Sequence, residues 1–591
     1  MKIQVEPRLS FSVFPLLILF ISILAVPNSS FAKEQTVSKN MKPDEHLIIS
    51  GMVEDPHGKP VPEAVVRIFI NGNEYGAGES EGGVIHTSNQ GTFHIDLPLY
   101  KGEVYDSQIE LEISKNSFRK IEKFHVKDVQ MAGKSDDEKP RYLFEKTFQM
   151  THDAGPAYFI AAIILVLVYI FIAFDIIHRT LAAMLGATLL LFISYTLGTF
   201  FPEYFVLSFE NAIGFVDFNV IFLLMGMMII VGIMKETGIF QWLAYKSFQY
   251  SKGSVFGLTV ILMAVTAVTS AFLDNVTTML LLTPVTIEIA LVINVSPVSL
   301  LIPLVLASNI GGTATLIGDP PNIMIGSYAH LTFNDFLINL TPVVVIVFVI
   351  QVVMMKIIYG REYEKARIVD LEQLTERLSK EYRIRDKRLL SISGVILAGV
   401  IALFIAHGAL HMEPGIAAIT GAAFLLLFSG VNIVHPLEKD VEWSTLIFFI
   451  MLFIIVGACE ETGLIQAIAD QVIVMSQGSL VIAIILVLWV SAITSALIDN
   501  IPFTATMLPV VAHLTQTLPG ADSTILWWAL AFGACFGGNG SLIGASANVV
   551  TAGLSEKAGY PISFLGFAKI GFPVMVMSMI VATLWLVFVE M

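Results

Sequence analysis

Long apolar segments recur along this chain, and they limit its fold more than any other feature. Ten of them approach or exceed the roughly 20 residues that a helix needs to cross a bilayer core. Backbone polar groups in lipid must be satisfied within their own segment, so such segments are predicted to be helices. The ten run approximately over residues 156–175, 180–199, 218–234, 298–326, 333–358, 389–408, 413–432, 443–459, 525–549 and 566–589. The expected fold is an all-α polytopic membrane protein, with the lipid bilayer as its surroundings.

Composition supports this reading and excludes other classes. Of the 591 residues, 55% are hydrophobic and only 14% are charged. The net charge of −15 argues against a nucleic-acid partner, because such proteins carry basic patches. Cys459 and Cys535 both lie in apolar segments, which favours packing roles over a disulfide.

The N-terminal residues carry an export signal. Lys2 and Arg8 precede an apolar run, and a small-x-Ala sequence ends at Ala32. Residues 1–32 are therefore expected to be a signal peptide or a signal anchor. Both alternatives place the next segment outside the cytoplasm.

Residues 44–148 are polar and alternate valine and isoleucine between turn signals, which predicts a small exported β-sandwich. The segment resembles carboxypeptidase-regulatory-like or immunoglobulin-like accessory domains. The resemblance rests on Gly51, Val53, Asp55, Gly58, Pro60, Val61, Ala64, Gly91 and Phe93.

A basic stretch divides the membrane region into residues 156–360 and residues 389–591. Residues 361–388 between them are expected to be a cytoplasmic amphipathic linker, because basic loops stay inside. Residues 33–150 and the C-terminus then lie on the outer face of a plasma (inner) membrane. When the crossings are counted from the outside at residue 150, the linker lies in the cytoplasm only if the apolar stretch 255–293 enters and leaves the membrane on the same side. This stretch, which polar residues interrupt, is therefore expected to be a re-entrant hairpin.

An internal repeat gives a second hairpin. The stretch TSAFLDNVTTMLLLTPV from Thr269 matches TSALIDNIPFTATMLPV from Thr494 at an offset of 225 residues. GGTATLIGDPPN from Gly311 matches GGNGSLIGASAN from Gly537 at an offset of 226. The crossing count gives the two copies opposite orientations, so inverted repeats with two re-entrant hairpins and broken helices are expected.

The breaks bring polar groups to membrane depth. Glycines and prolines in GGTATLIGDPPN interrupt a helix and free backbone groups, which an ion or polar substrate can satisfy. The hairpin tips add Asp274-Asn275 and Asp499-Asn500. Hard oxygen donors of this kind suit Na+ or H+, and an aspartate at membrane depth is a functional candidate by default, which also includes Asp319.

These motifs resemble the ion transporter superfamily, and within it the ArsB/NhaD and citrate-transporter-like (SLC13-like) permeases, especially their P-protein-like branch. The resemblance implies hairpins that meet unwound helices at Na+ and substrate sites, an elevator-like motion and a homodimer. In the first half it implies a site of Ser270, Asp274, Asn275, Thr277, Asn309, Gly311, Gly312, Thr313, Thr315 and Asn322. In the second half it implies Ser495, Asp499, Asn500, Thr504, Gly537, Gly538, Asn539, Ser541 and Asn548. Na+ is expected at Asn275 and Asn500.

The predicted function is ion-coupled secondary transport of an inorganic ion or small anion, with Na+ or H+ as the coupling ion and no other cofactor. The alternatives are an NhaD-type Na+/H+ antiporter, a di- or tricarboxylate symporter and a P-protein-like chloride conductance. Asp-Asn tips differ from the neutral tips of dicarboxylate carriers, and no arginine is expected in the site to bind a carboxylate. No catalytic constellation indicates an enzyme.

Overall fold

The computed structural model describes residues 45–590 apart from 57, 59, 76–84, 101, 116, 128, 135–138, 366–375, 377–381 and 522–523. The predicted signal segment, residues 1–32, lies outside the described residues, as does most of the predicted amphipathic linker. The positions of the following elements come from the described residues alone.

Residues 45–149 contain two β-sheets. One has the strand order β5-β1-β9-β8 and the other has the order β3-β2-β6-β7, with β4 also paired to β2. In β1 buried residues alternate strictly with partly buried ones, as the period of a strand with one covered face requires. The strands are β1 (Glu45–Glu54), β2 (Val65–Ile70), β3 (Asn73–Glu74), β4 (Ile85–His86), β5 (Thr92–Leu99), β6 (Ile109–Ser114), β7 (Ile121–His125), β8 (Gln130–Lys134) and β9 (Pro140–Gln149). The predicted β character is confirmed, and the packing of the sheets into a sandwich stays a prediction.

The remainder is helical. Among the described residues, ten helices are long and apolar enough to cross a membrane, which confirms a polytopic membrane protein. The first copy of the repeat (repeat 1) comprises α7 (Phe218–Glu236), α8 (Ile239–Tyr250), α9 (Val255–Phe272), α10 (Asn275–Val292), α11 (Pro297–Gly312), α12 (Pro320–Tyr328) and α13 (Phe333–Lys365). The second copy (repeat 2) comprises α17 (Trp443–Glu461), α18 (Leu464–Ser476), α19 (Leu480–Leu497), α20 (Asn500–Thr517), α21 (Ile525–Gly537), α22 (Ser546–Lys557) and α23 (Phe564–Trp585).

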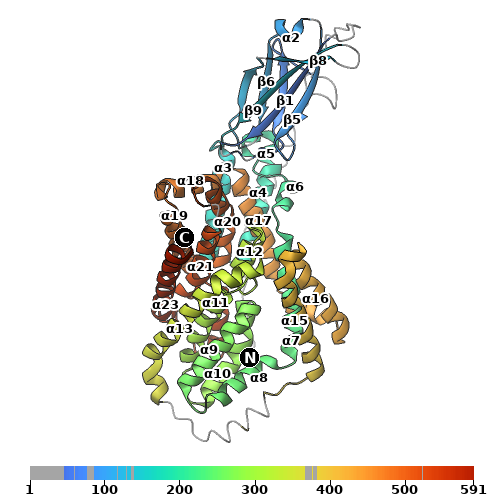
Figure 1. The fold of residues 1–591 in the computed structure, drawn as a ribbon. Helices are drawn as coiled ribbons and strands as arrows, with labels where there is room; N and C mark the ends of the chain where they lie inside the picture. Colours follow the sequence, from blue (N-terminus) through green and yellow to red (C-terminus); the bar gives the residue numbers. More distant parts are fainter. Residues whose placement is uncertain are drawn as a thin grey trace, which may run out of the picture. The chain divides into compact units, whose positions relative to one another are not determined.

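Two helices precede each copy. They are α3 (Pro156–Ala173) and α4 (Arg179–Tyr195) before repeat 1, and α15 (Lys387–Leu410) and α16 (Pro414–Ser429) before repeat 2. The short elements are α2 (Glu103–Asp106), α5 (Leu197–Phe200), η1 (Pro202–Tyr204), α6 (Phe209–Gly214), η2 (Pro436–Asp440), η3 (Gly538–Gly540) and η4 (Leu586–Glu590). Figure 1 labels most of these elements.

The two copies share backbone conformation at their irregular points. Gly238 and Gly463, which separate α7 from α8 and α17 from α18, are left-handed with φ of 79° and 81°. Leu273 and Ile498, which end α9 and α19, have φ of −126° and −129°. The sequence duplication is therefore a duplication of local structure, whereas the inversion of the copies across a membrane stays a prediction.

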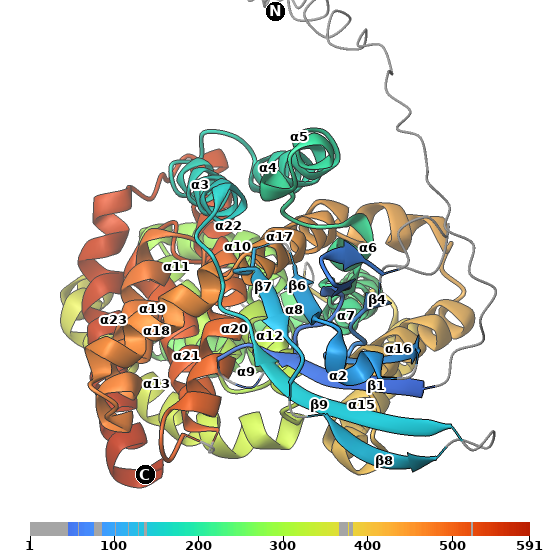
Figure 2. The ribbon, with the colours of Figure 1, turned by 90° about the horizontal axis from the view of Figure 1, so that it is seen from above.

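The helices of the two halves exchange partners. Helix α4, which precedes repeat 1, packs on α17 of repeat 2, and α16 packs on α7. A Cβ added to Gly226 of α7 would lie 2.6 Å from the Ala418 carbonyl carbon of α16, so these backbones touch. Figure 2 shows α7 beside α16 on one side of the helical region and α19, α21 and α23 grouped on the other. These contacts between helices of different halves hold the two halves of the helical region together.

The interrupted apolar stretch 255–293 and its counterpart in repeat 2 each form a pair of helices. In repeat 1, α9 ends at Phe272 and α10 begins at Asn275, and in repeat 2 the equivalent break separates α19 from α20. The predicted single segments 298–326 and 525–549 are also broken, after Gly312 and after Gly537. The course of the hairpins through a bilayer stays a prediction.

Close approach of α11 to α9 depends on Gly311. A Cβ added there would lie 2.3 Å from the Ala267 carbonyl oxygen, so the alanine variant must push two backbones apart. We expect Gly311→Ala to destabilise the protein by about 1–3 kcal/mol, which a lower midpoint of thermal unfolding in detergent would show. Gly394→Ala on α15 is the matched control, because no atom lies within 4 Å of its added Cβ. Equal midpoints for the two variants would contradict this packing.

Candidate functional site

Each hairpin tip presents an aspartate at the start of a helix. Asp274 caps α10, since its Oδ1 accepts a hydrogen bond from the Thr277 amide at 2.8 Å. Asp499 caps α20, since its Oδ1 accepts from the Ile501 amide at 3.1 Å. Helix N-termini carry partial positive charge and unpaired N–H groups, so both carboxylates are oriented by their own helix. The second oxygen of each carboxylate is then available to other groups.

An asparagine closes the break in repeat 1. The Asn322 Nδ2 donates to the carbonyl oxygens of Thr313 at 3.1 Å and of Thr315 at 2.9 Å. The Thr315 hydroxyl in turn donates to the Ala271 carbonyl at the end of α9. Side chains of the same repeat thus satisfy these carbonyls, and the binding of an ion or substrate at the break stays a prediction.

Repeat 2 closes its break in the same way. The Asn548 Nδ2 donates to the carbonyl oxygens of Gly538 at 2.8 Å and of Ser541 at 2.9 Å. The Ser541 hydroxyl donates to the Ala496 carbonyl at the end of α19. Each break is therefore fastened to the hairpin of its own repeat by one amide and one hydroxyl.

A chain of asparagines joins the two breaks. The Asn275 Nδ2 donates to Asn309 Oδ1 at 3.3 Å, and the Asn309 Nδ2 donates to Asn539 Oδ1 at 2.9 Å and to Asn548 Oδ1 at 3.0 Å. All four side chains are at most 2% exposed. The structure thus brings these four predicted residues together at the meeting point of the repeats.

Other predicted residues form hydrogen bonds within their own helix or to a neighbouring helix of the same repeat. The hydroxyls of Thr504, Thr313 and Ser495 donate to nearby backbone carbonyls, those of Asn500, Asn309 and Ala534 respectively. The Ser270 hydroxyl accepts from Ser308 at 3.1 Å. Four predicted glycines allow neighbouring segments to approach closely, because an added Cβ would meet their atoms: Gly311, Gly312, Gly537 and Gly538.

Asp319 lies where repeat 1 meets repeat 2. It precedes α12, is 0% exposed, and its Oδ1 accepts from Asn500 Nδ2 at 3.3 Å. Its Oδ2 is buried and has no hydrogen-bond partner among the described residues. A buried carboxylate without a cationic partner is costly, so this oxygen is a site for a proton or a cation.

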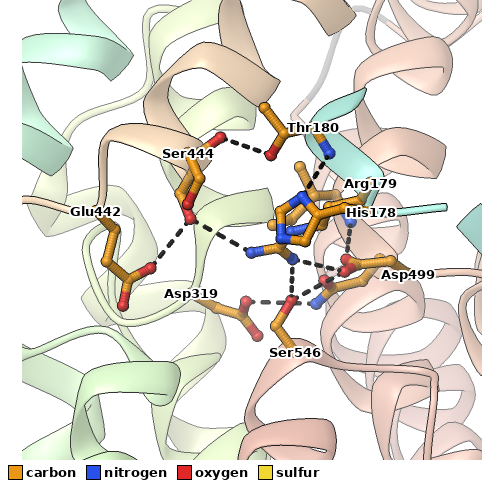
Figure 3. Close-up of polar contacts among 11 residues, drawn as sticks. His178, Arg179, Thr180, Asp319, Glu442, Ser444, Asp499 and Ser546 are labelled. Carbon is orange, nitrogen blue, oxygen red and sulfur yellow. Dashed lines mark hydrogen bonds and ion pairs between the residues drawn. The ribbon is translucent and has the colours of Figure 1, made fainter. Parts of the chain in front are cut away.

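The structure places an arginine in the site, which corrects the expectation that none is present. Arg179, the first residue of α4, directs Nη1 to Asp499 Oδ2 at 3.0 Å and to the Ser546 hydroxyl (Figure 3). The Ser546 hydroxyl also donates to Asp499 Oδ2 at 2.9 Å. The side chains of Arg179 and Asp499 are 23% and 11% exposed, so the pair is largely shielded from solvent.

Residues of α17 complete the surroundings of this ion pair. Arg179 Nη2 lies 3.4 Å from the Thr445 hydroxyl, and the Arg179 guanidinium lies 5.4 Å from the centre of the Phe448 ring. The Thr445 hydroxyl donates to Glu442 Oε2 at 3.0 Å. Arg179 therefore joins α4 and α17 to the tip of the repeat 2 hairpin.

The sequence did not identify Arg179, Ser546 and Thr445 as site residues, because none of them stands out in its local sequence. Arg179 flanks an apolar segment, where arginines commonly face the membrane interface. Ser546 lies in the repeated motif, but its equivalent in repeat 1 is Pro320, so the repeat did not mark it as a polar site residue, and Thr445 belongs to no repeated motif. The one available signal was that a lone arginine separates two apolar segments whose connection is only a few residues long.

The donor set favours a small hard cation. Among the described residues, no group of three or more His, Cys, Asp or Glu side chains could hold a metal ion. The oxygen donors near the breaks are amides and hydroxyls with individual carboxylates, those of Asp274 and Asp499 at the helix caps and that of Asp319 beside Asn500. Oxygen donors of this kind suit alkali and alkaline-earth cations rather than transition metals.

Apolar membrane helices, broken at buried polar groups and arranged as two copies of one unit, define a membrane transporter. Residues 169–533 match the family model described as CitMHS, citrate transporter. The chain belongs to this citrate transporter family.

Two sequence relatives agree with this assignment. An uncharacterized transporter of Mycobacterium tuberculosis (strain H37Rv) is 43% identical over 429 residues, which cover 72% of this chain and 97% of the mycobacterial protein. The human P protein is 37% identical over 502 residues, which cover 72% of this chain and 59% of the P protein. The crystal structure of the YdaH transporter of Alcanivorax borkumensis aligns with 69% of this chain and 98% of its own, at 13% identity and a TM-score of 0.48.

Proposed function

We propose that this protein is an ion-coupled secondary transporter that moves an inorganic ion or a small anion, with Na+ or H+ as the coupling ion. The coupling ion binds at the meeting point of the repeats, where the hairpin tips face the two breaks. The transported species shares this region, as the predicted site residues imply.

The buried carboxylate of Asp319 carries the proposal. Its Oδ2 is buried with no hydrogen-bond partner among the described residues, and its Oδ1 accepts from Asn500 at the repeat 2 tip. A Na+ or H+ at this oxygen neutralises the charge and favours contact between the two halves. Charge at this point thus affects both halves of the carrier at once.

Arg179 supplies the second element of the mechanism. It neutralises Asp499 when no cation is bound there, and it does so from α4, outside either repeat. A cation that binds Asp499 competes with the guanidinium and weakens the contact between α4 and the hairpin. Ion binding is thereby coupled to release of the hairpin from α4 and α17, as alternating access requires.

Proteoliposomes with a pH dye inside test the coupling ion. We expect lumenal alkalinisation after external addition of either NaCl or sodium gluconate, with the membrane potential clamped. The paired variant Asp274→Asn/Asp499→Asn removes both tip charges and is expected to lower the initial rate at least tenfold.

The salts separate the alternatives. A response to NaCl but not to gluconate would contradict cation coupling, and a chloride current measured in the same proteoliposomes would then favour a chloride conductance. No response to either salt would contradict Na+/H+ exchange, and citrate uptake driven by a Na+ gradient would then be the next measurement. An unchanged rate in the paired variant would remove Asp274 and Asp499 from the mechanism.

A further inference from the structure

A second polar site lies away from the repeat interface. A cavity of about 700 Å³ opens between α8 and the residues that lead into α15. Four basic side chains line it, Lys246, Arg383, Arg385 and Lys387, together with the rings of Trp242 and Tyr245. None of the residues that line it is acidic.

The backbone holds the basic residues in place. The Arg385 amide donates to the Thr237 carbonyl at 2.8 Å, at the turn between α7 and α8. The neighbouring Gly238 is left-handed, and a Cβ added to it would lie 3.0 Å from the Arg383 carbonyl oxygen. The Tyr382 hydroxyl donates to Glu288 of α10. The segment that carries the arginines is thus docked on repeat 1.

Among the described residues, no carboxylate forms an ion pair with the basic side chains of this cavity, those of Lys246, Arg383, Arg385 and Lys387. Lys246 Nζ lies 5.7 Å from the centre of the Trp242 ring, and it donates to an amide, Gln249 Oε1, at 2.7 Å. The adjacent carboxylate, Asp386, is occupied as the cap of α15. Four cations around one cavity repel one another unless an anion lies among them.

We propose that this cavity binds a phosphate-bearing anion. Two arginines match the oxygens of a phosphate group with paired N–H donors, and the lysines add charge. The Trp242 and Tyr245 rings provide an apolar wall for the rest of the molecule. An acidic phospholipid headgroup and a soluble phosphate ester share this chemistry. Because the ligand would touch both α8 and the segment before α15, it would strengthen their contact.

Ligand-dependent thermal stability of the full chain in neutral detergent tests the site. The probes are short-chain phosphatidylglycerol, phosphatidylcholine of the same chain length, and inorganic phosphate. We expect phosphatidylglycerol to raise the unfolding midpoint saturably and phosphatidylcholine to have no effect. In Arg383→Gln/Arg385→Gln the apparent Kd for phosphatidylglycerol should rise at least tenfold.

The matched control is Arg361→Gln/Arg388→Gln, which removes two exposed charges nearby that do not line the cavity. Lys246→Gln provides a second cavity variant if the arginine pair fails to fold, as judged by size-exclusion elution. Stabilisation by phosphatidylglycerol alone would identify a lipid headgroup, and stabilisation by inorganic phosphate as well would identify a soluble phosphate ester. Equal weakening in the control, or equal effects of the two lipids on the wild type, would overturn the proposal.

Discussion

Replacement of Arg179 by glutamine is expected to destabilise the carrier and to tighten its binding of the coupling cation. The substitution leaves the Asp499 carboxylate, whose side chain is 11% exposed, with only Ser546 and the Ile501 amide as partners. A partly buried pair lies between the exposed and buried cases, so we expect a loss of about 2 kcal/mol. Without the competing guanidinium, the Na+ concentration for half-maximal stabilisation should fall several-fold. Thermal unfolding over a NaCl series, with choline chloride at equal ionic strength, measures both effects.

A double variant separates charge from packing. In Arg179→Gln/Asp499→Asn both charges are absent, so most of the lost stability should return, while ion-driven transport stays low. The difference between the double variant and the sum of the single ones gives the coupling energy of the pair. Stability losses that simply add would contradict a direct interaction. A Na+ affinity unchanged by Arg179→Gln would contradict competition at Asp499.

Replacement of Asp319 by asparagine is expected to abolish ion coupling without unfolding the protein. The side chain keeps its shape, and its oxygen still accepts from Asn500, but the buried charge disappears. Removal of an uncompensated buried charge should leave stability unchanged or raise it by about 1–3 kcal/mol. Ion-driven pH change in proteoliposomes should fall at least a hundredfold.

The control for this variant is Asp96→Asn in β5, an exposed position whose carboxylate lies 3.0 Å from His46 Nδ1. It makes the same chemical change in a β-strand, outside the predicted site residues, and its transport rate should equal that of the wild type. If Asp319→Asn retained ion-driven transport, the tip carboxylates alone would bind the coupling ion, and Asp319 would have no part in the mechanism. Loss of stability in Asp319→Asn would indicate that the charge has a partner in the resting carrier.

The sequence was informative about elements and less so about contacts between them. Apolar length predicted the helices because lipid leaves a backbone few alternatives, and the repeat predicted where helices break. The capping roles of Asp274 and Asp499 follow from the same local rules.

Long-range contacts explain what could not be predicted. Arg179 meets Asp499 across 320 positions, and nothing in the local pattern of either residue indicates the other. The asparagines of the breaks looked like ligands for an ion, but Asn322 and Asn548 first satisfy backbone carbonyls. A side chain with a hydrogen-bonding amide can serve a ligand or the fold, and only the folded geometry shows which.

The hydrogen bonds that Asn322 and Asn548 make across the two helix breaks bear on uncoupled transport, in which the carrier changes conformation without its ion. Because Asn322 and Asn548 bond the interrupted backbone through their own amides, we expect the breaks to keep their shape whether or not an ion is bound. Under the proposed function, order in the breaks then does not distinguish the loaded carrier from the unloaded one. We expect the buried carboxylate of Asp319 to make that distinction, so a neutral side chain there should give uncoupled transport.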